Sequence, residues 1–180
     1  MRKGQTSPDS RSGQRGFSLI ELLIVVAVIL IIAAIAIPNL LRAKIAANEA
    51  SAVSAVRTLT TAETTYASSW GSGYAATIDN LGGGTPCGPA TAGTACIVDS
   101  SISVAPYQKS GYTFAAVGNT PTGAINNGFE VNASPVSVGV TGQRAFCADQ
   151  TGVLRFNTTG VPIGTATGAC TGAGGILVGN

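Results

Sequence analysis

The segment that most constrains this chain is Phe17 to Ile37, a run of 21 residues in which Ser18 and Glu21 are the only polar side chains. At about 1.5 Å per residue, an α-helix of this length crosses a hydrocarbon core of roughly 30 Å. The sequence therefore predicts one membrane-spanning helix near the N-terminus, and the rest of the chain must be compatible with that anchor.

The residues on either side of this segment indicate its orientation. Residues 1–16 are polar, contain no apolar stretch of their own and do not resemble an ordinary secretory signal. Four cations precede the apolar run and three follow it closely: Arg2, Lys3, Arg11 and Arg15 before it, and Arg42, Lys44 and Arg57 after it. This modest bias predicts a cytoplasmic N-terminus, with the remainder of the chain outside.

Beyond Pro38 the pattern becomes amphipathic, with apolar residues spaced by three, four or seven. The apolar positions are Leu41, Ile45, Ala52, Val56, Leu59 and Tyr66, and the polar positions between them are Arg42, Asn48, Glu49, Arg57 and Glu63. We expect the helix to continue to about Ser69, which makes Phe17 to Ser69 one rod of about 80 Å. Only its second half has a domain of its own to pack against.

After residue 70 the helical pattern gives way to loops and short strands. Glycines 71 and 73 end the helix, and a loop region is expected from Gly82 to about Ser110. Four alternating or aromatic runs then predict an antiparallel sheet: Tyr112 to Val117, Gly128 to Ala133, Arg144 to Asp149 and Val153 to Asn157. The tail after Gly160 is expected to be irregular.

These elements predict an α+β fold, a long N-terminal helix packed on a small antiparallel sheet. The expected organisation is a segment 1–16, a membrane helix 17–38, an amphipathic helix 39–70, and a region 71–180 of loops, sheet and C-terminal tail.

The four cysteines, Cys87, Cys96, Cys147 and Cys170, contain no Cys-x-x-Cys pair. The sequence therefore argues against a zinc site and against thioredoxin-like redox chemistry. For a domain outside the cytosol, an even number of cysteines indicates two disulfides. Three connectivities are possible. Neighbour pairing, Cys87 with Cys96 and Cys147 with Cys170, closes short loops and is the pairing we expect, although the sequence leaves the other two open.

Composition narrows the function. The chain has no histidine, which removes the usual general base and imidazole metal ligands. Residues 1–16 carry four cations and Asp9, which gives them a net charge of +3. The whole chain has a net charge of +2, so the residues after Gly16 have a net charge of −1. No basic stripe for nucleic acid is evident. Glu130 and Asp149 are isolated in sequence and do not form the pattern of a calcium cage. We expect no enzyme, no cofactor and no metal.

Residues Gly16 to Leu41 read GFSLIELLIVVAVILIIAAIAIPNLL. This stretch closely resembles the N-terminus of type IV prepilins and of the pseudopilins of type II secretion, over about 26 residues without a gap. The resemblance implies that a membrane peptidase, the prepilin peptidase, cuts between Gly16 and Phe17 and methylates the new amine of Phe17. Ser18 stands where threonine is more usual. In related filaments the stretch around Pro38 can unwind, beyond the kink that a proline itself produces.

Glu21 is the one carboxylate in the apolar run. A charge at the centre of a bilayer costs on the order of 3 kcal/mol on insertion scales, so Glu21 either lies near enough to the interface to be solvated or needs a partner. The resemblance favours the partner, because in this family the glutamate is thought to meet the N-terminal ammonium of an adjacent subunit. Glu21 and the Phe17 amine are therefore the expected assembly pair.

The resemblance implies the structural subunit of a type IV pilus. Such a subunit is first inserted in the lipid of the inner membrane. The pilus assembly machinery there then polymerises it with other copies of the same subunit into an extracellular filament that serves adhesion, motility or uptake. The alternative is a pseudopilin of type II secretion, and a more remote one is a single-pass anchored binding module. Cys147 and Cys170 resemble the disulfide that closes the C-terminal loop of many pilins, an exposed region used for subunit contacts and adhesion. The alternative is that this disulfide is only a structural staple for a loop-rich end.

Overall fold

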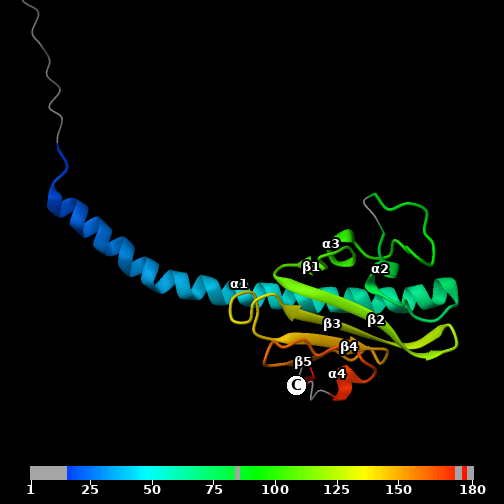
Figure 1. Cartoon of the computed structure of the whole chain (residues 1–180). Coiled ribbons are helices and arrows are strands. Elements are labelled where there is room, and N and C mark those ends of the chain that lie inside the picture. The colour runs from blue at the N-terminus through cyan, green and yellow to red at the C-terminus, as the bar shows by residue number, and fades with distance from the viewer. Residues whose placement is uncertain (1–15, 84–85, 173–175, 178–180) are drawn as a thin grey trace, which may run out of the picture. The chain divides into compact units, whose positions relative to one another are not determined.

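The computed structural model describes residues 16–83, 86–172 and 176–177. The chain divides into two compact units, residues 1–39 and residues 40–180, and the division falls inside one long helix, α1 (Leu19–Trp70) (Figure 1). The two units are taken in turn.

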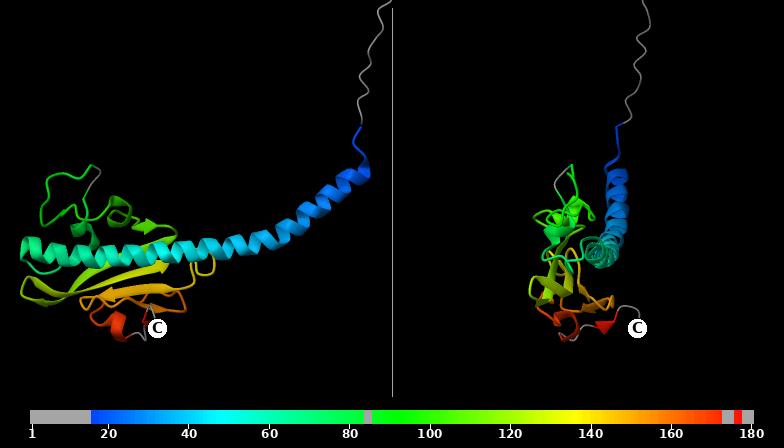
Figure 2. Two further views of the ribbon diagram at one scale, coloured as in Figure 1. Left: turned by 180° about the vertical axis from the view of Figure 1, so that it is seen from behind. Right: turned by 90° about the vertical axis from the view of Figure 1, so that its right-hand side faces the viewer.

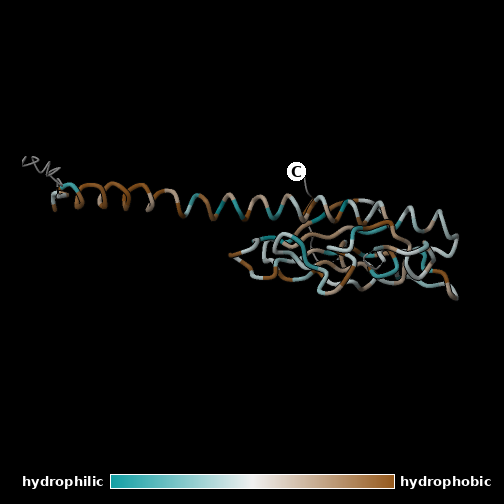
Figure 3. Tube along the Cα trace, turned by 90° about the horizontal axis from the view of Figure 1, so that it is seen from above, coloured by the Kyte–Doolittle hydropathy of each residue, from teal (hydrophilic) through white to brown (hydrophobic). Residues whose placement is uncertain are grey.

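The first unit, over its described residues, is the apolar half of α1. The helix begins at Leu19, two residues later than the sequence suggested, and Pro38 lies inside it. Figure 3 shows this half coloured hydrophobic along its length, whereas hydrophobic and hydrophilic residues alternate further along α1. Such a pattern is typical of a segment that is surrounded by apolar material on all sides.

The second unit contains the rest of α1 and a six-stranded sheet. Neighbouring strands are antiparallel and follow chain order: β1 (Gln108–Lys109), β2 (Tyr112–Thr122), β3 (Ile125–Pro135), β4 (Ala145–Asp149), β5 (Arg155–Asn157) and β6 (Ile176–Leu177). The second half of α1 runs along this sheet (Figure 2). The α+β prediction is confirmed, and all four expected strands are present, with β2 and β3 longer than predicted.

Several short elements were not predicted. They are α2 (Ile78–Leu81) and α3 (Ser100–Ser103) in the expected loop region, and α4 (Ala169–Gly172) in the expected irregular tail, together with the edge strands β1 and β6. Each has only two or four residues, too few for a periodic signal. Tertiary contacts hold them: the Ile97 and Val98 amides donate to the Leu81 carbonyl at 2.9 and 3.0 Å.

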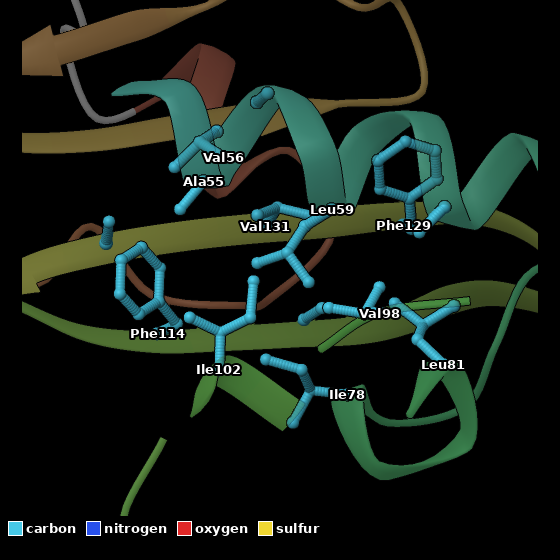
Figure 4. Packing of buried hydrophobic residues seen from close by; sticks show 14 of the residues in the cluster. Ala55, Val56, Leu59, Ile78, Leu81, Val98, Ile102, Phe114, Phe129 and Val131 are labelled. Atoms are coloured by element: carbon cyan, nitrogen blue, oxygen red, sulfur yellow. The ribbon is translucent and has the colours of Figure 1, made fainter. Parts of the chain in front are cut away.

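The hydrophobic core lies between α1 and one face of the sheet, with α2 and α3 covering its edge (Figure 4). Ala52, Val56 and Leu59 of α1 are 0% exposed. They meet alternate residues of the two long strands, such as Phe114 and Val131, while α2 and α3 contribute further apolar side chains. Because side chains alternate along a strand, the opposite face of the sheet carries a different set, which includes Glu130, Asn132, Cys147 and Asp149.

Two residues placed on the polar side of the amphipathic helix are in fact buried. Glu49 is 7% exposed and Glu63 is 0% exposed. Both fall at three- and four-residue steps within the core stripe, whose positions are Glu49, Ala52, Val56, Leu59, Glu63 and Tyr66. The expectation was wrong because it sorted residues by polarity, whereas their position in the helical repeat decides which face they occupy. Leu41 differs in the other direction and is 46% exposed.

Candidate processing and assembly site

The Gly16–Phe17 junction lies immediately before α1, in residues that form no regular element. Both residues are exposed, Phe17 to 80%, and a Cβ built on Gly16 meets nothing within 4 Å. Steric demand within this chain therefore does not account for a glycine at position 16. A peptidase can reach the bond without unwinding the helix.

Glu21 caps the helix that carries it. Ser18 precedes the first helical residue, and its backbone amide donates to Glu21 Oε2 at 3.1 Å. This contact is one half of a capping box, in which a glutamate at the third helical position satisfies an amide that the helix leaves free. Glu21 Oε1 has no hydrogen bond among the residues that the structure describes. The Ser-x-x-Glu spacing is the signal by which sequence reasoning alone could have found this contact.

The surface around this end of α1 is apolar and uncovered. An 18-residue window of the helix has a mean hydropathy of 3.3, and none of it is buried by the rest of the chain. Leu22, Ile29 and Ile35 are 59%, 58% and 64% exposed. Exposure of this kind is incompatible with water, so this half of α1 requires lipid or other protein chains around it.

Pro38 interrupts the hydrogen bonding of α1, because proline has no amide hydrogen. The helix nevertheless continues through it, and the division between the two units falls one residue later. The expected kink at Pro38 remains a prediction.

The structure pairs Cys87 with Cys96 and Cys147 with Cys170, the two pairs expected from the sequence. They differ in environment. Cys147 and Cys170 are both 0% exposed, whereas Cys87 is exposed and Cys96 partly so. The second disulfide joins β4 to α4 and so holds the C-terminal segment against the face of the sheet opposite α1.

A buried glutamate holds the same C-terminal segment. Glu130 on β3 is 1% exposed, and its Oε2 accepts from the Cys170 amide at 3.3 Å. Burial raises the pKa of Glu130, and the backbone amides of Cys170, Gly168 and Ala169 oppose that shift. Asp149 lies directly across from Glu130 in the register of β3 and β4. The two acids that looked isolated in sequence are therefore neighbours, although no group of three or more metal-ligating side chains occurs among the described residues.

Glu49 fastens α1 to the start of β4. Its Oε2 accepts from Arg144 Nη2 at 2.6 Å and Nε at 2.9 Å, and its Oε1 accepts from the amides of Gln143 and Arg144 at 3.0 and 3.1 Å. Burial alone would raise the pKa of Glu49, but these hydrogen bonds and the Arg144 charge outweigh it and lower the pKa. The carboxylate is thus held ionised where α1 meets the sheet.

Glu63 is in the opposite situation. Its Oε2 accepts from the Ala75 amide at 2.8 Å, while its Oε1 is buried with no partner among the described residues. No cation is close enough to compensate, so burial raises the pKa of Glu63 to about 7. The contact ties α1 to the turn that follows it.

The expected site residues thus form two groups. Gly16 and Phe17 lie just before α1 and Glu21 lies in its first turn, whereas the disulfides lie in the second unit. The sequence contains no histidine, and the residues that the structure describes include no group of three or more Cys, Asp or Glu side chains that could hold a metal ion.

The comparison with known families identifies the N-terminal segment. The family model for the prokaryotic N-terminal methylation motif matches residues 11–37. The chain therefore carries the signal of type IV pilin-like and prepilin-like proteins, and its long apolar helix and α+β domain agree with that class. No curated protein and no solved structure matches the chain.

Proposed function

We propose that this protein is a structural subunit of a type IV pilus. The observation that carries the proposal is the combination, on one helix, of a matched methylation motif and an apolar surface that the chain leaves uncovered. A lone membrane anchor needs the second feature but not the first. The protein acts by polymerising and has no enzymatic role.

The chain is first inserted in the inner membrane with residues 1–16 in the cytoplasm, as the excess of cations before the span favours. The prepilin peptidase removes residues 1–16 at the exposed Gly16–Phe17 bond and methylates Phe17. The assembly machinery then draws the subunit out of lipid. Residues 17–38 exchange lipid for the helices of neighbouring copies, residues 39–70 bind the domain to the filament core, and residues 71–180 form the outer shell.

Glu21 and the Phe17 amine form the contact between copies. Within one chain the Ser18 amide donates to Oε2 of Glu21. Oε1 of Glu21 therefore remains able to accept from the Phe17 ammonium of an adjacent subunit. Pairing neutralises two charges that would otherwise enter the apolar core alone, where an unpaired charge costs roughly 3 to 5 kcal/mol. The geometry of α1 supports both roles for one carboxylate.

The test is to shear filaments from cells and examine them by electron microscopy and mass spectrometry. We expect the protein to be a component of long extracellular filaments that vanish when its gene is deleted and return with a plasmid copy. A chain that stays in the cell envelope and is required for secretion of folded proteins would instead be a type II secretion pseudopilin. An unprocessed chain absent from any filament would contradict both.

A further inference from the structure

A second surface of α1, in the domain, lacks the charges of an ordinary solvated helix. Between Ala46 and Ser69 its exposed side chains are alanine, serine and threonine, with Arg57 the single charged one. Surface helices usually carry many charged side chains on the solvent side. Small side chains instead allow another chain to approach the backbone closely.

The threonine hydroxyls on this surface are already satisfied. Thr58, Thr61 and Thr65 donate to carbonyls one turn earlier at 3.0, 3.0 and 2.9 Å. A hydroxyl that donates within its own helix loses less when water is removed than a free one, because its donor does not need a new partner. The free-energy cost of removing water from this face of α1 is therefore low.

Arg57 stands between two grooves on the same surface. One groove, of about 370 Å³, lies between α1 and Ile97, and the other, of about 310 Å³, lies between α1 and the turn that contains Gly152. Arg57 and Thr61 line both of them. The Arg57 side chain is exposed, and it makes no ion pair or hydrogen bond with any residue that the structure describes. We call the two together the Arg57 grooves.

The chain also contains an acidic residue that could pair with Arg57 of another copy. Of the six Asp and Glu residues in the second unit, four are buried: Glu49, Glu63, Glu130 and Asp149. The exposed two, Asp79 and Asp99, belong to α2 and to the cap of α3. Hydrogen bonds from Ser101 lower the pKa of Asp99, and the positive charge of Lys109 adds a smaller effect in the same direction. The Asp79 carboxylate accepts from the Tyr107 hydroxyl at 2.9 Å and makes no ion pair with any residue that the structure describes.

We propose that the Arg57 grooves receive the α2 surface of a second copy of this chain, with Arg57 paired to Asp79 of that copy. This inference rests on the proposed filament. A contact between two different patches of identical subunits is heterologous, and repetition of it builds a ring where the rotation closes and an open helix where it does not. An open helix is the form that the proposed filament requires. The domain thus supplies a second contact that fixes how copies are oriented, in addition to the packing of the apolar half of α1.

Charge exchange tests this contact in cells that lack other copies of the subunit. Arg57→Glu places like charges together and is expected to lower the yield of sheared filaments by about tenfold or more. Adding Asp79→Arg to the same chain restores opposite charges and is expected to return most of the yield. Lys44→Glu makes the same change of charge at an exposed position of α1 outside both grooves, and is expected to leave the yield unchanged.

Proximity is tested by cysteine cross-linking between chains. Cells co-express one chain with Arg57→Cys and another with Asp79→Cys, so that a 57–79 disulfide can form only between copies. We expect an oxidant-dependent cross-linked dimer in the sheared fraction, and none when position 44 replaces position 57.

Each outcome has a distinct meaning. Filaments from wild type, combined with normal yield from Arg57→Glu and no cross-link, overturn this contact and leave the proposed function standing. Equal loss from Lys44→Glu, or no rescue by Asp79→Arg, also overturns it, because the effect then follows total charge or folding. Absence of the wild-type chain from sheared filaments overturns the proposed function together with this contact.

Discussion

Glu49 and Glu63 lie on the same face of α1 and are both buried, yet their environments are opposite. Glu49 receives four hydrogen bonds, two of them from a guanidinium, and its pKa is lowered. Glu63 receives one, from an amide, and its pKa is raised to about 7. The helix supplies the position of each carboxyl group, and the residues packed against it decide whether a charge there stabilises the fold.

Replacing Glu63 by Gln should stabilise the domain at high pH. The pKa of Glu63 in the folded chain, about 7, exceeds the ordinary 4.5, so the contribution of Glu63 to the unfolding free energy is most favourable below pH 4.5, falls as pH rises and levels off above about pH 7. A difference of this size corresponds to about 3 kcal/mol. We expect Glu63→Gln to gain up to that amount at pH 8 and almost nothing at pH 4.

The measurement is urea unfolding of the full chain in detergent micelles, followed by the fluorescence of Trp70, the single tryptophan, which stacks on Tyr66. Stability curves of the variant and wild type that stay parallel from pH 4 to 8 would show that Glu63 does not titrate in this range.

Glu49→Gln should have the opposite sign. The pKa of Glu49 is lowered by its partners, so its contribution is present above pH 4.5 and is lost as pH falls below that value. Because the Arg144 side chain is 43% exposed, solvent weakens the ion pair, and we expect a loss of about 2 kcal/mol at pH 7 that shrinks toward pH 3. Lys44→Gln, which removes an exposed charge from the same helix, should change the unfolding free energy by less than about 0.5 kcal/mol. An equal loss from both variants would mean that the loss at Glu49 follows the removal of any charge from this helix rather than the bonds to Arg144.

Among the elements, α1 lies in two different environments although it is a single helix. Its first half is apolar on every side, and its second half has a narrow stripe that packs on the sheet. Its start is held by a side chain of its own, Glu21, through the Ser18 amide. The carboxylate at this point therefore has an intrachain role that is separable from any contact with another copy.

Two substitutions of Glu21 separate those roles. Glu21→Gln keeps an oxygen that can accept from Ser18 but removes the charge, whereas Glu21→Ala removes both. We expect both variants to insert and to be cleaved, and both to yield few filaments, because the ammonium of a neighbouring copy would enter the core unpaired. Membrane and sheared fractions are compared with wild type. Full yield from Glu21→Gln with failure of Glu21→Ala would assign the role of Glu21 to capping alone.

The two disulfides should respond differently to reductant. Because Cys147 and Cys170 are fully buried and Cys87 is exposed, mild dithiothreitol at neutral pH should reduce only the Cys87–Cys96 bond. Alkylation and peptide mapping identify the freed thiols. Reduction of Cys147–Cys170 should require urea and should destabilise the domain by about 3 kcal/mol, as expected for a loop of this length. Early labelling of Cys170 would show that the C-terminal segment opens readily.

At the scale of the whole molecule, one chain contains two units whose surfaces suit different surroundings. The first is compatible with lipid or with other helices, and the second has its own core and two disulfides. In the proposed function, conversion from a membrane protein to a polymer follows removal of residues 1–16, replaces lipid around the first unit and adds the proposed Arg57 contact of the second.

The mature chain should begin at Phe17 and carry a methyl group on its amine. Intact mass analysis of the sheared fraction gives both facts, and Gly16→Leu provides the matched comparison, since none of the described residues lies within 4 Å of a Cβ at position 16. We expect the variant to fold and insert but to remain uncut. Wild-type protein with residues 1–16 still attached in filaments, or cut beyond Ile37, would be inconsistent with prepilin processing.

The sequence by itself determined the candidate membrane-spanning helix, the methylation motif and the α+β class. The first two depend on consecutive residues, because partition into lipid sums over a run such as Phe17 to Ile37 and the motif occupies residues 11–37. The helical stripe and the longer strands were also predictable, since each repeats a local period over many residues.

Only the tertiary structure showed which of the isolated carboxylates are buried and which groups donate hydrogen bonds to them. Glu49, Glu63 and Glu130 are buried because amides distant in sequence, those of Gln143, Ala75 and Cys170, satisfy them. No local pattern encodes such a partner. The same holds for the grooves around Arg57, whose walls come from segments far apart in the chain, because a surface exists only once the elements that form it have packed together.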